Sequence, residues 1–481
     1  MGGGAISRRR RRVTRPRASH VAVVGGGLAG IAAALDLVDA GARVSLFESR
    51  PRLGGATWSF TREGRHFDNG QHVFLRCCDA YRRLLERLGT TELAPIQERL
   101  EIPVLRPRSG QEPVLSVITR SALPPPLHLG GSLATYRHLS VADRLRLGIA
   151  VRALLAAAPS DPALDSETFG AFLRRHGQSD AAIDRLWDLI ALPTTNLHAG
   201  EVSAAVAVKV FKTGLLEESD AADIGWSRVP LLELHGAPAL AELERAGARV
   251  ALRAKVDGFD LEAGDTGPSR IVGVKAAGET VPVDAVVLAV PHLQAATLAP
   301  DEAELSRAQL LALGSSPIID VHVVYADKVM DFPIAAGVDS KVQYVFDTSS
   351  AAGLEPGEGQ CLAVSVSAAD EEHGDDPEVL IKRYVSALAE MFPRAASTKV
   401  LDAVVTREHH ATFRAVPGTA PMRPGVTTAL PNLFLAGSWT DTGWPATMEG
   451  AVRSGNRAAW HVRNLFDGPH ARSRRAPEAV A

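Results

Sequence analysis

Residues 20–30 of this 481-residue chain read HVAVVGGGLAG, and residues 43–48 read RVSLFE. The run 21–24 is short and apolar, which is typical of a buried parallel strand. The segment 31–40 is rich in Ala and Leu at helical spacing, and Gly41 after it is a residue type that ends helices. With residues 43–48 as a second strand, the stretch predicts a strand-turn-helix-strand unit.

Gly25, Gly27 and Gly30 have the spacing of a dinucleotide-binding turn. The first glycine permits the tight turn, the second lets the backbone approach a pyrophosphate, and the third lets helix and strand pack closely. The helix N-terminus that follows would present free N–H groups to the phosphates. Glu48 ends the second strand, where a carboxylate can bind both hydroxyls of a ribose. The unit therefore predicts a bound dinucleotide.

The residues after Glu48 distinguish between possible dinucleotides. A carboxylate at this place favours an unphosphorylated ribose, and so FAD or NAD over NADP. Residues 52–55 read RLGG, and this second glycine pair lets the chain pass close to another part of a long cofactor. NAD does not require a second pair. The sequence therefore predicts FAD.

Strand patterns recur at 249–291 and 431–437, and a helix is expected at 448–462. Residues 134–220 have a mainly helical pattern, and residues 316–404 mix strands with a helix near 378–392. We expect an α/β fold, with a Rossmann-like FAD-binding domain and an inserted α+β substrate domain. The expected FAD-binding segments are 20–105, 235–310 and 405–468. The expected substrate domain comprises 106–234 and 311–404. We expect a basic arm (1–19) and a tail (469–481) to be disordered.

Two C-terminal segments complete the pattern, because residues 435–439 (LAGSW) end a strand and residues 449–451 (EGA) open a helix. With the glycine motifs, they resemble the FAD-dependent amine oxidase and phytoene desaturase superfamily over nearly the whole chain. The resemblance implies non-covalent FAD in a two-domain fold, with the substrate in a tunnel above the flavin. The FAD contacts that it implies are Gly25, Gly27, Leu28, Ala29, Gly30, Glu48, Ser49, Arg52, Gly54, Gly55, Ala56, Thr57, Val256, Gly437, Ser438, Thr447, Met448 and Glu449.

Residues 444–455 (WPATMEGAVRSG) distinguish the branches of this superfamily. Amine oxidases carry a tyrosine of an aromatic cage where Thr447 stands, so amine oxidation is disfavoured. The stretch instead resembles the isoprenoid branch. Within that branch, five segments resemble the hydroxysqualene dehydroxylase family: 54–60, 68–72, 228–236, 411–414 and 439–445. The expected substrate pocket comprises Asn196, Phe413, Trp444 and Thr447.

This resemblance implies reductive removal of the hydroxyl of hydroxysqualene to give squalene, in hopanoid or isoprenoid biosynthesis. Hydride would come from N5 of the reduced flavin, and a general acid is needed because hydroxide leaves poorly. His72 is a candidate acid, with a structural histidine as the alternative. The chain departs from the family at Ser438, where Asp is usual, and residues 192–196 are only loosely similar.

Two other functions stay open at this point. A carotenoid or phytoene-type desaturase would move hydride the other way, from a long isoprenoid to FAD. A membrane-surface flavoprotein could instead serve as a scaffold or chaperone for a neighbouring prenyl synthase. Turnover by the isolated chain separates this last class from both enzymes.

Composition limits the partners and the location. The chain is 46% hydrophobic and 22% charged, with a net charge of −3, and seven arginines lie in its first 20 residues. The rest is acidic, which argues against nucleic acid; the arginine run is either inert or attracted to anionic lipid. The three cysteines form no disulfide framework, and no metal site is expected, since the Cys77-Cys78 pair has no second pair.

No apolar run reaches the roughly 18–20 residues of a membrane-spanning helix. The N-terminus lacks the apolar segment of a signal peptide. We expect a cytoplasmic protein that is peripheral (monotopic) at the cytoplasmic membrane. Residues 123–155, which contain a proline-rich loop and an arginine-bearing helix, are the expected membrane entrance for a long-chain isoprenoid substrate.

Overall fold

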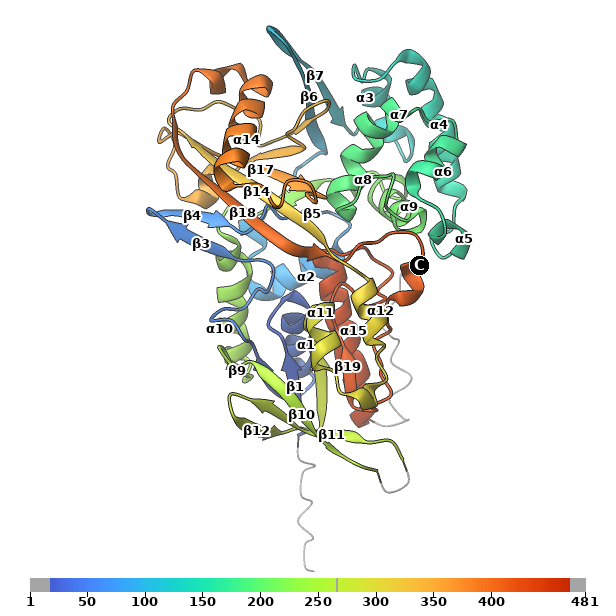
Figure 1. Cartoon of the computed structure of the whole chain (residues 1–481), viewed down its shortest axis with the longest axis vertical. Helices are drawn as coiled ribbons and strands as arrows, with labels where there is room; N and C mark the ends of the chain where they lie inside the picture. Colours follow the sequence, from blue (N-terminus) through green and yellow to red (C-terminus); the bar gives the residue numbers. More distant parts are fainter. Residues whose placement is uncertain (1–17, 265–266, 468–481) are drawn as a thin grey trace, which may run out of the picture.

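The computed structural model describes residues 18–264 and 267–467 of the chain. The molecule has two lobes (Figure 1): a lower one around a parallel sheet, and an upper one with a long antiparallel sheet beside a group of helices. The expected disordered tail 469–481 lies outside the described residues, as does the expected basic arm 1–19 except for residues 18 and 19.

The lower lobe is built on a five-stranded parallel sheet, in which the strand-turn-helix-strand unit is confirmed. Its central strand, β1, is wholly buried, which explains why its sequence is a continuous apolar run. The strands expected near 285–290 and 433–437 also form, and they join β1 from distant parts of the chain. In spatial order the strands are β19 (Leu433–Leu435), β13 (Ala285–Leu288), β1 (His20–Val24), β2 (Arg43–Phe47) and β9 (Arg249–Ala251).

Helices cover this sheet, and a small antiparallel meander lies at its lower end (Figure 1). The first and last helices, α1 and α15, pack along each other and share one apolar cluster with the sheet. The helices of this lobe are α1 (Leu28–Asp39), α2 (Asp79–Leu88), α10 (Ala237–Arg245), α11 (His292–Leu298), α12 (Arg307–Ala312) and α15 (Met448–Asp467). The meander is β10 (Val256–Glu262), β11 (Arg270–Ala276) and β12 (Glu279–Pro282).

The upper lobe contains a seven-stranded sheet that is antiparallel except where β15 meets β6. The helix expected near 378–392 forms as α14 (Pro377–Met391) and covers one face of the sheet. In spatial order the strands are β18 (Val400–Thr412), β14 (Ser316–Tyr325), β17 (Gln360–Ser367), β16 (Tyr344–Asp347), β15 (Ile334–Gly337), β6 (Glu101–Arg108) and β7 (Gln111–Thr119). Two of these strands, β6 and β18, cross the domain boundaries expected at 105/106 and 404/405.

The mainly helical pattern of residues 134–220 is confirmed by a group of helices beside this sheet (Figure 1). They are α3 (Gly130–Ala134), α4 (Val141–Ala156), α5 (Pro162–Asp165), α6 (Phe169–Arg175), α7 (Asp180–Ala182), α8 (Asp188–Thr195) and α9 (Ala204–Phe211). A short helix, α13 (Ser349–Ala352), follows β16. The helices of the group beside the sheet bury their aromatic side chains against one another.

Two small antiparallel sheets lie between the lobes: the hairpin of β3 (Ser59–Arg62) with β4 (Arg65–Asp68), and the pair of β5 (Val73–Leu75) with the distant strand β8 (Ile224–Trp226). Residues 69–72 run between β4 and β5 and lie against β14 of the upper lobe, where Gln71 donates its N–H to Asp320. The segment that follows the second glycine pair therefore forms part of the contact between the lobes.

Candidate active site

The turn between β1 and α1 has the geometry that its three glycines predict. Gly25 has a φ of +108°, and a Cβ on Gly30 would collide with the carbonyl oxygen of Gly25. Around Gly27, in contrast, a Cβ would approach nothing nearer than the Gly55 Cα, 3.8 Å away. The protein thus leaves the space above Gly27 open. No side chain caps the N-terminus of α1 at Leu28, so its first N–H groups can bind a phosphate.

The second glycine pair lies directly against this turn. The Gly54 N–H donates to the carbonyl oxygen of Gly26 at 2.9 Å, and Gly54 has a φ of +109°. Thr57 Oγ1 donates to the Gly54 carbonyl oxygen at 2.9 Å and closes the loop. Beside it, the Arg52 guanidinium lies over the Trp58 ring, 4.4 Å from its centroid. Two segments far apart in sequence therefore form one backbone-lined cradle.

Glu48 is buried at the edge of the cradle. Its Oε2 accepts the N–H of Gly26 at 2.7 Å, and its Oε1 accepts the N–H of Arg50 at 2.7 Å and the Ser49 hydroxyl at 3.2 Å. Oε2 accepts only one of these bonds and can accept a further one from a ribose hydroxyl. The backbone also pairs Glu48 with Ala254, so the start of β10 at Val256 follows closely. These residues fit the adenosine half of FAD.

The second half of the site lies in the C-terminal segment. The Gly437 N–H donates to Ser454 Oγ at 2.7 Å, which joins the end of β19 to α15. Arg423 then donates to the carbonyl oxygens of Ser438 and Thr440, at 3.1 and 2.5 Å. Burial lowers the pKa of Arg423 to about 10. Sequence reasoning missed Arg423, because no local motif shows that an arginine before β19 supports the loop after it.

Thr447 and Glu449 have structural roles that the resemblance did not imply. Thr447 Oγ1 accepts the N–H of Gly450 at 3.1 Å and so caps α15. The buried Glu449 carboxylate points to another helix and accepts the N–H groups of Ala80 and Tyr81, at 3.1 and 2.7 Å. The carboxylate thus serves α2, which needs an acceptor for its first N–H groups because its own cap residue, Cys78, supplies none. The flavin contact expected at Glu449 stays a prediction. Met448 is the first residue of α15.

His72, the candidate acid, is a poor proton donor in this structure. Its Nδ1 lies 2.8 Å from the Gly70 carbonyl oxygen, and burial lowers the pKa of the imidazole. A neutral imidazole ring that is held by its own loop fits the alternative interpretation, in which His72 is a structural histidine. The contact does place His72 in the segment between the two lobes.

A buried carboxyl group that sequence reasoning missed lies beside this segment. Asp320, in β14, is 1% exposed, and its Oδ1 accepts the Gln71 N–H at 3.0 Å. Its Oδ2 has no hydrogen-bond partner in the described part of the chain. Burial raises the pKa of Asp320 to about 7. The signal was an acidic residue within the apolar run 318–325.

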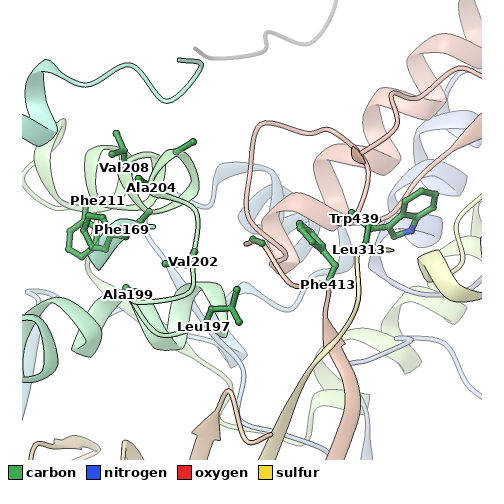
Figure 2. Close-up of a cluster of buried hydrophobic side chains, with 14 of the residues drawn as sticks. Phe169, Leu197, Ala199, Val202, Ala204, Val208, Phe211, Leu313, Phe413 and Trp439 are labelled. Carbon is green, nitrogen blue, oxygen red and sulfur yellow. The ribbon is translucent and has the colours of Figure 1, made fainter. Parts of the chain in front are cut away.

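Asn196 and Phe413, two of the expected substrate-pocket residues, have different surroundings. Asn196 is a structural joint, because its Nδ2 donates to Ser316 O and Thr412 Oγ1 while its Oδ1 accepts the Ala368 N–H. These bonds occupy its amide, and its place in the substrate pocket stays a prediction. Phe413 is buried, and Figure 2 shows it beside Leu313 and Trp439, apart from the aromatic residues of the helical group.

Trp444, the remaining pocket residue, has two cations near its ring and lies next to the start of α15. The Arg453 guanidinium lies 4.7 Å from its ring centroid, and the Lys209 ammonium lies 5.7 Å from it.

Among the described residues, no group of three or more His, Cys, Asp or Glu side chains is placed to hold a metal ion.

The parallel sheet, the glycine cradle and the buried Glu48 define an FAD-dependent oxidoreductase. The chain belongs to the flavin-containing amine oxidoreductase family, whose family model matches residues 28–463. FAD is therefore the cofactor, and the cradle has the geometry to hold it. This assignment agrees with the resemblance that the motifs indicated at the level of the superfamily.

Two kinds of relative are similar to the chain over almost its whole length. Hydroxysqualene dehydroxylase of Rhodopseudomonas palustris is 30% identical over 445 residues, which cover 91% of this chain and 97% of the relative. Zeta-carotene desaturase of Synechocystis is 27% identical over 479 residues, covering 92% and 96%. The fold is also that of cyclohexylamine oxidase from Brevibacterium oxydans, with a TM-score of 0.66, 20% identity, and coverage of 94% and 100%.

Proposed function

We propose that this oxidoreductase removes the hydroxyl group of hydroxysqualene to give squalene. The observation that carries the proposal is Thr447, which caps α15 at the position where an amine oxidase has a cage aromatic. Its small side chain gives an amine no aromatic wall. The 30% identity to hydroxysqualene dehydroxylase, over nearly the full length of both chains, supports the dehydroxylation reaction in particular.

FAD, when bound in its two-electron reduced form, supplies the hydride that replaces the hydroxyl group. The protein chain binds the cofactor, positions the substrate against it and keeps water out of the site. The cradle of Gly27 and Gly55 would hold the pyrophosphate, and Glu48 would hold the ribose. Buried apolar side chains, including Phe413 and Trp439, exclude water from the C-terminal half of the site.

A carotenoid or phytoene-type desaturase is the alternative function. Its support is the 27% identity to zeta-carotene desaturase. The same fold and cofactor would serve a reaction in which hydride moves from the isoprenoid to oxidised FAD. The two proposals therefore differ in the direction of hydride transfer and in the substrate.

We further propose that the isoprenoid enters from a membrane surface at α4. Val141, Leu145 and Ile149 are spaced four residues apart, so they form one stripe, and the Leu145 side chain is 78% exposed. The opposite face of α4 is buried through Leu147 and Leu154. Leu123 and Leu127, on the loop before α3, add exposed apolar side chains, and Arg144 and Arg152 bring positive charge to α4 itself.

No helix in the described part of the chain is long and apolar enough to cross a bilayer.

The reaction is tested by giving dithionite-reduced holoenzyme hydroxysqualene without oxygen, and by giving oxidised holoenzyme phytoene in parallel. We expect squalene from the first and no product from the second, identified by mass. Deuterium at flavin N5 should appear on the carbon that lost oxygen. If the oxidised enzyme desaturates phytoene while hydroxysqualene stays unchanged, the desaturase is the correct function.

A further inference from the structure

Asp320 lies on the face of β14 that is turned away from α14. Its neighbours in the strand, Ile319 and Val321, are buried in the cluster that contains α14. Because side chains alternate along a strand, Asp320 and His322 project to the other face. There they meet residues 67–71 of the lower lobe: His322 Nε2 lies 3.1 Å from Asp68 O, and Asp320 accepts the Gln71 N–H.

A short series of contacts leads from the FAD cradle to Asp320. Ala56 follows the second glycine pair, and its carbonyl oxygen accepts Asn69 Nδ2 at 2.8 Å. The next residue, Gly70, lies against the carboxyl group, since a Cβ there would be 3.0 Å from Asp320 Oδ2. The unpartnered oxygen therefore points at the segment that continues from the cradle.

The other direction along β14 leads towards the C-terminal half of the site. Ile318, two residues before Asp320 on the same face, is only half-buried. Ser316, two residues further, accepts Asn196 Nδ2 at its carbonyl oxygen and pairs with Thr412, which precedes Phe413. Asp320 thus stands between the FAD cradle and the strand end that carries Phe413.

The ionisable groups around Asp320 include two acids and two neutral imidazoles. Asp68 and Glu408 are the neighbouring acids, and both disfavour a negative charge on Asp320. On the same side, burial lowers the pKa values of His72 and His322, that of His322 to about 4, so neither ring is a cation at neutral pH. The surroundings favour a carboxyl group that carries its proton.

We propose that Asp320 is the general acid that protonates the departing hydroxyl group. This inference rests on the proposed dehydroxylation and names its missing proton donor. The C–O bond breaks, its electron pair stays on oxygen, and that oxygen takes the Asp320 proton and leaves as water. The carbon receives hydride from the two-electron reduced flavin, and the Asp320 carboxylate regains a proton from solvent.

The first test compares Asp320→Asn with Asp165→Asn in prereduced holoenzyme mixed with hydroxysqualene under anaerobic conditions. Asparagine keeps the acceptor for the Gln71 N–H but has no acidic proton. We expect flavin reoxidation to slow by about 10²–10³-fold in Asp320→Asn. Asp165, a buried acid whose carboxylate accepts the Ser203 hydroxyl and the Ala420 N–H, is the matched control, and its variant should keep at least about a tenth of the rate.

An acetate ester of hydroxysqualene makes the test specific for proton donation. Acetate leaves without a proton, so the ester should restore Asp320→Asn to within about tenfold of the wild-type rate with the same ester. If Asp320→Asn is equally slow with the alcohol and the ester, or as fast as wild type with the alcohol, the role of Asp320 is overturned. The proposed dehydroxylation is not affected by that result. A wild-type enzyme that is inert with hydroxysqualene overturns the proposed function and this role together.

The second readout does not depend on turnover. The infrared difference spectrum of the oxidised holoenzyme, wild type minus Asp320→Asn, should show the carbonyl band of a protonated carboxylic acid at pH 6, which fades as the pH rises through about 7. Burial also raises the pKa of Asp68 to about 6, and the subtraction removes the band that Asp68 contributes to both proteins. Asp165→Asn in place of wild type should give the same difference band. A difference spectrum without this band rules out a protonated Asp320.

Discussion

Glu449 Oε2 accepts the backbone N–H of Tyr81 at 2.7 Å, across 368 residues of sequence. The same carboxylate accepts the Ala80 N–H and pairs with Arg453 Nε at 2.6 Å. One buried charge thus caps the N-terminus of α2 from the first turn of α15. It joins the beginning and the end of the FAD-binding lobe.

Replacing Glu449 with Gln should destabilise the protein strongly. The amide keeps one acceptor, but it leaves Arg453 without its counter-charge and weakens the cap of α2. A broken buried ion pair costs about 3–5 kcal/mol, so the free energy of unfolding in urea should fall by about that amount. Asp180→Asn is the control, because its pair with Arg174 is exposed and should contribute less than about 1 kcal/mol. Equal losses in both variants would contradict the capping role.

Gly27→Val should abolish FAD binding while leaving the fold intact. Nothing in the protein lies within 3.8 Å of the added Cβ, so the side chain would fill only the space for the pyrophosphate. The purified wild-type protein should be yellow, and acid should release its flavin, since the binding is non-covalent. Affinity, measured by flavin fluorescence, should fall at least about 100-fold in the variant. Gly374→Val, at another open glycine, should remain yellow; normal flavin content in Gly27→Val would refute the assignment of the cradle.

Arg423→Gln should loosen the loop after β19. The guanidinium serves the carbonyl oxygens of Ser438 and Thr440, and its loss leaves buried acceptors unpaired, at about 2–4 kcal/mol. Flavin should therefore dissociate faster and the thermal midpoint should fall. Arg457→Gln removes a single bond to the same loop, to Asp441 O, and should change both quantities little. Comparable effects of the two variants would argue against a special role for Arg423.

The stability of the protein should depend on pH through Asp320. Burial raises the pKa of Asp320 from 3.8 to about 7. A carboxyl with a raised folded-state pKa favours folding at acid pH, and this contribution is lost as the pH rises from about 4 to about 7. Asp320→Asn cannot ionise, so its thermal midpoint relative to wild type should be higher at pH 8 than at pH 5. This difference corresponds to up to ~3 kcal/mol of stability, because wild type loses about 1.4 kcal/mol for each pH unit between pH 5 and pH 7. An identical difference at both pH values would show that Asp320 does not titrate in this range.

Leu145→Glu should weaken binding to anionic liposomes. The substitution places a negative charge in the middle of the exposed stripe of α4, and sedimentation with vesicles should fall several-fold. Val379→Glu, at an exposed apolar residue on α14, is the control and should have little effect. Deleting residues 1–17 should lower binding only at low salt, because its contribution is charge attraction. Wild-type protein that binds no liposomes at low salt would contradict the proposed membrane surface.

The β1-α1-β2 unit was predictable because every signal for it lies within thirty residues: an apolar run, three glycines and Glu48. The helix α14 was also predictable from its own periodicity. The roles of Arg423, Glu449 and Asp320 were not, because each depends on a partner that only the tertiary fold brings close. Asn196 shows the same limit, since an amide in a pocket-like motif turned out to hold three distant backbone segments together.

The order of strands in the lower lobe has a consequence for synthesis. Strand β1 emerges from the ribosome early, but its neighbour β13 follows much later, and β19 is made near the end of the chain. Until then, the edges of β1 and β2 are exposed to pairing with other chains. Such long-range pairing folds slowly. Newly made chains should therefore depend on chaperones until β19 and α15 are complete, and FAD should load only after translation has ended.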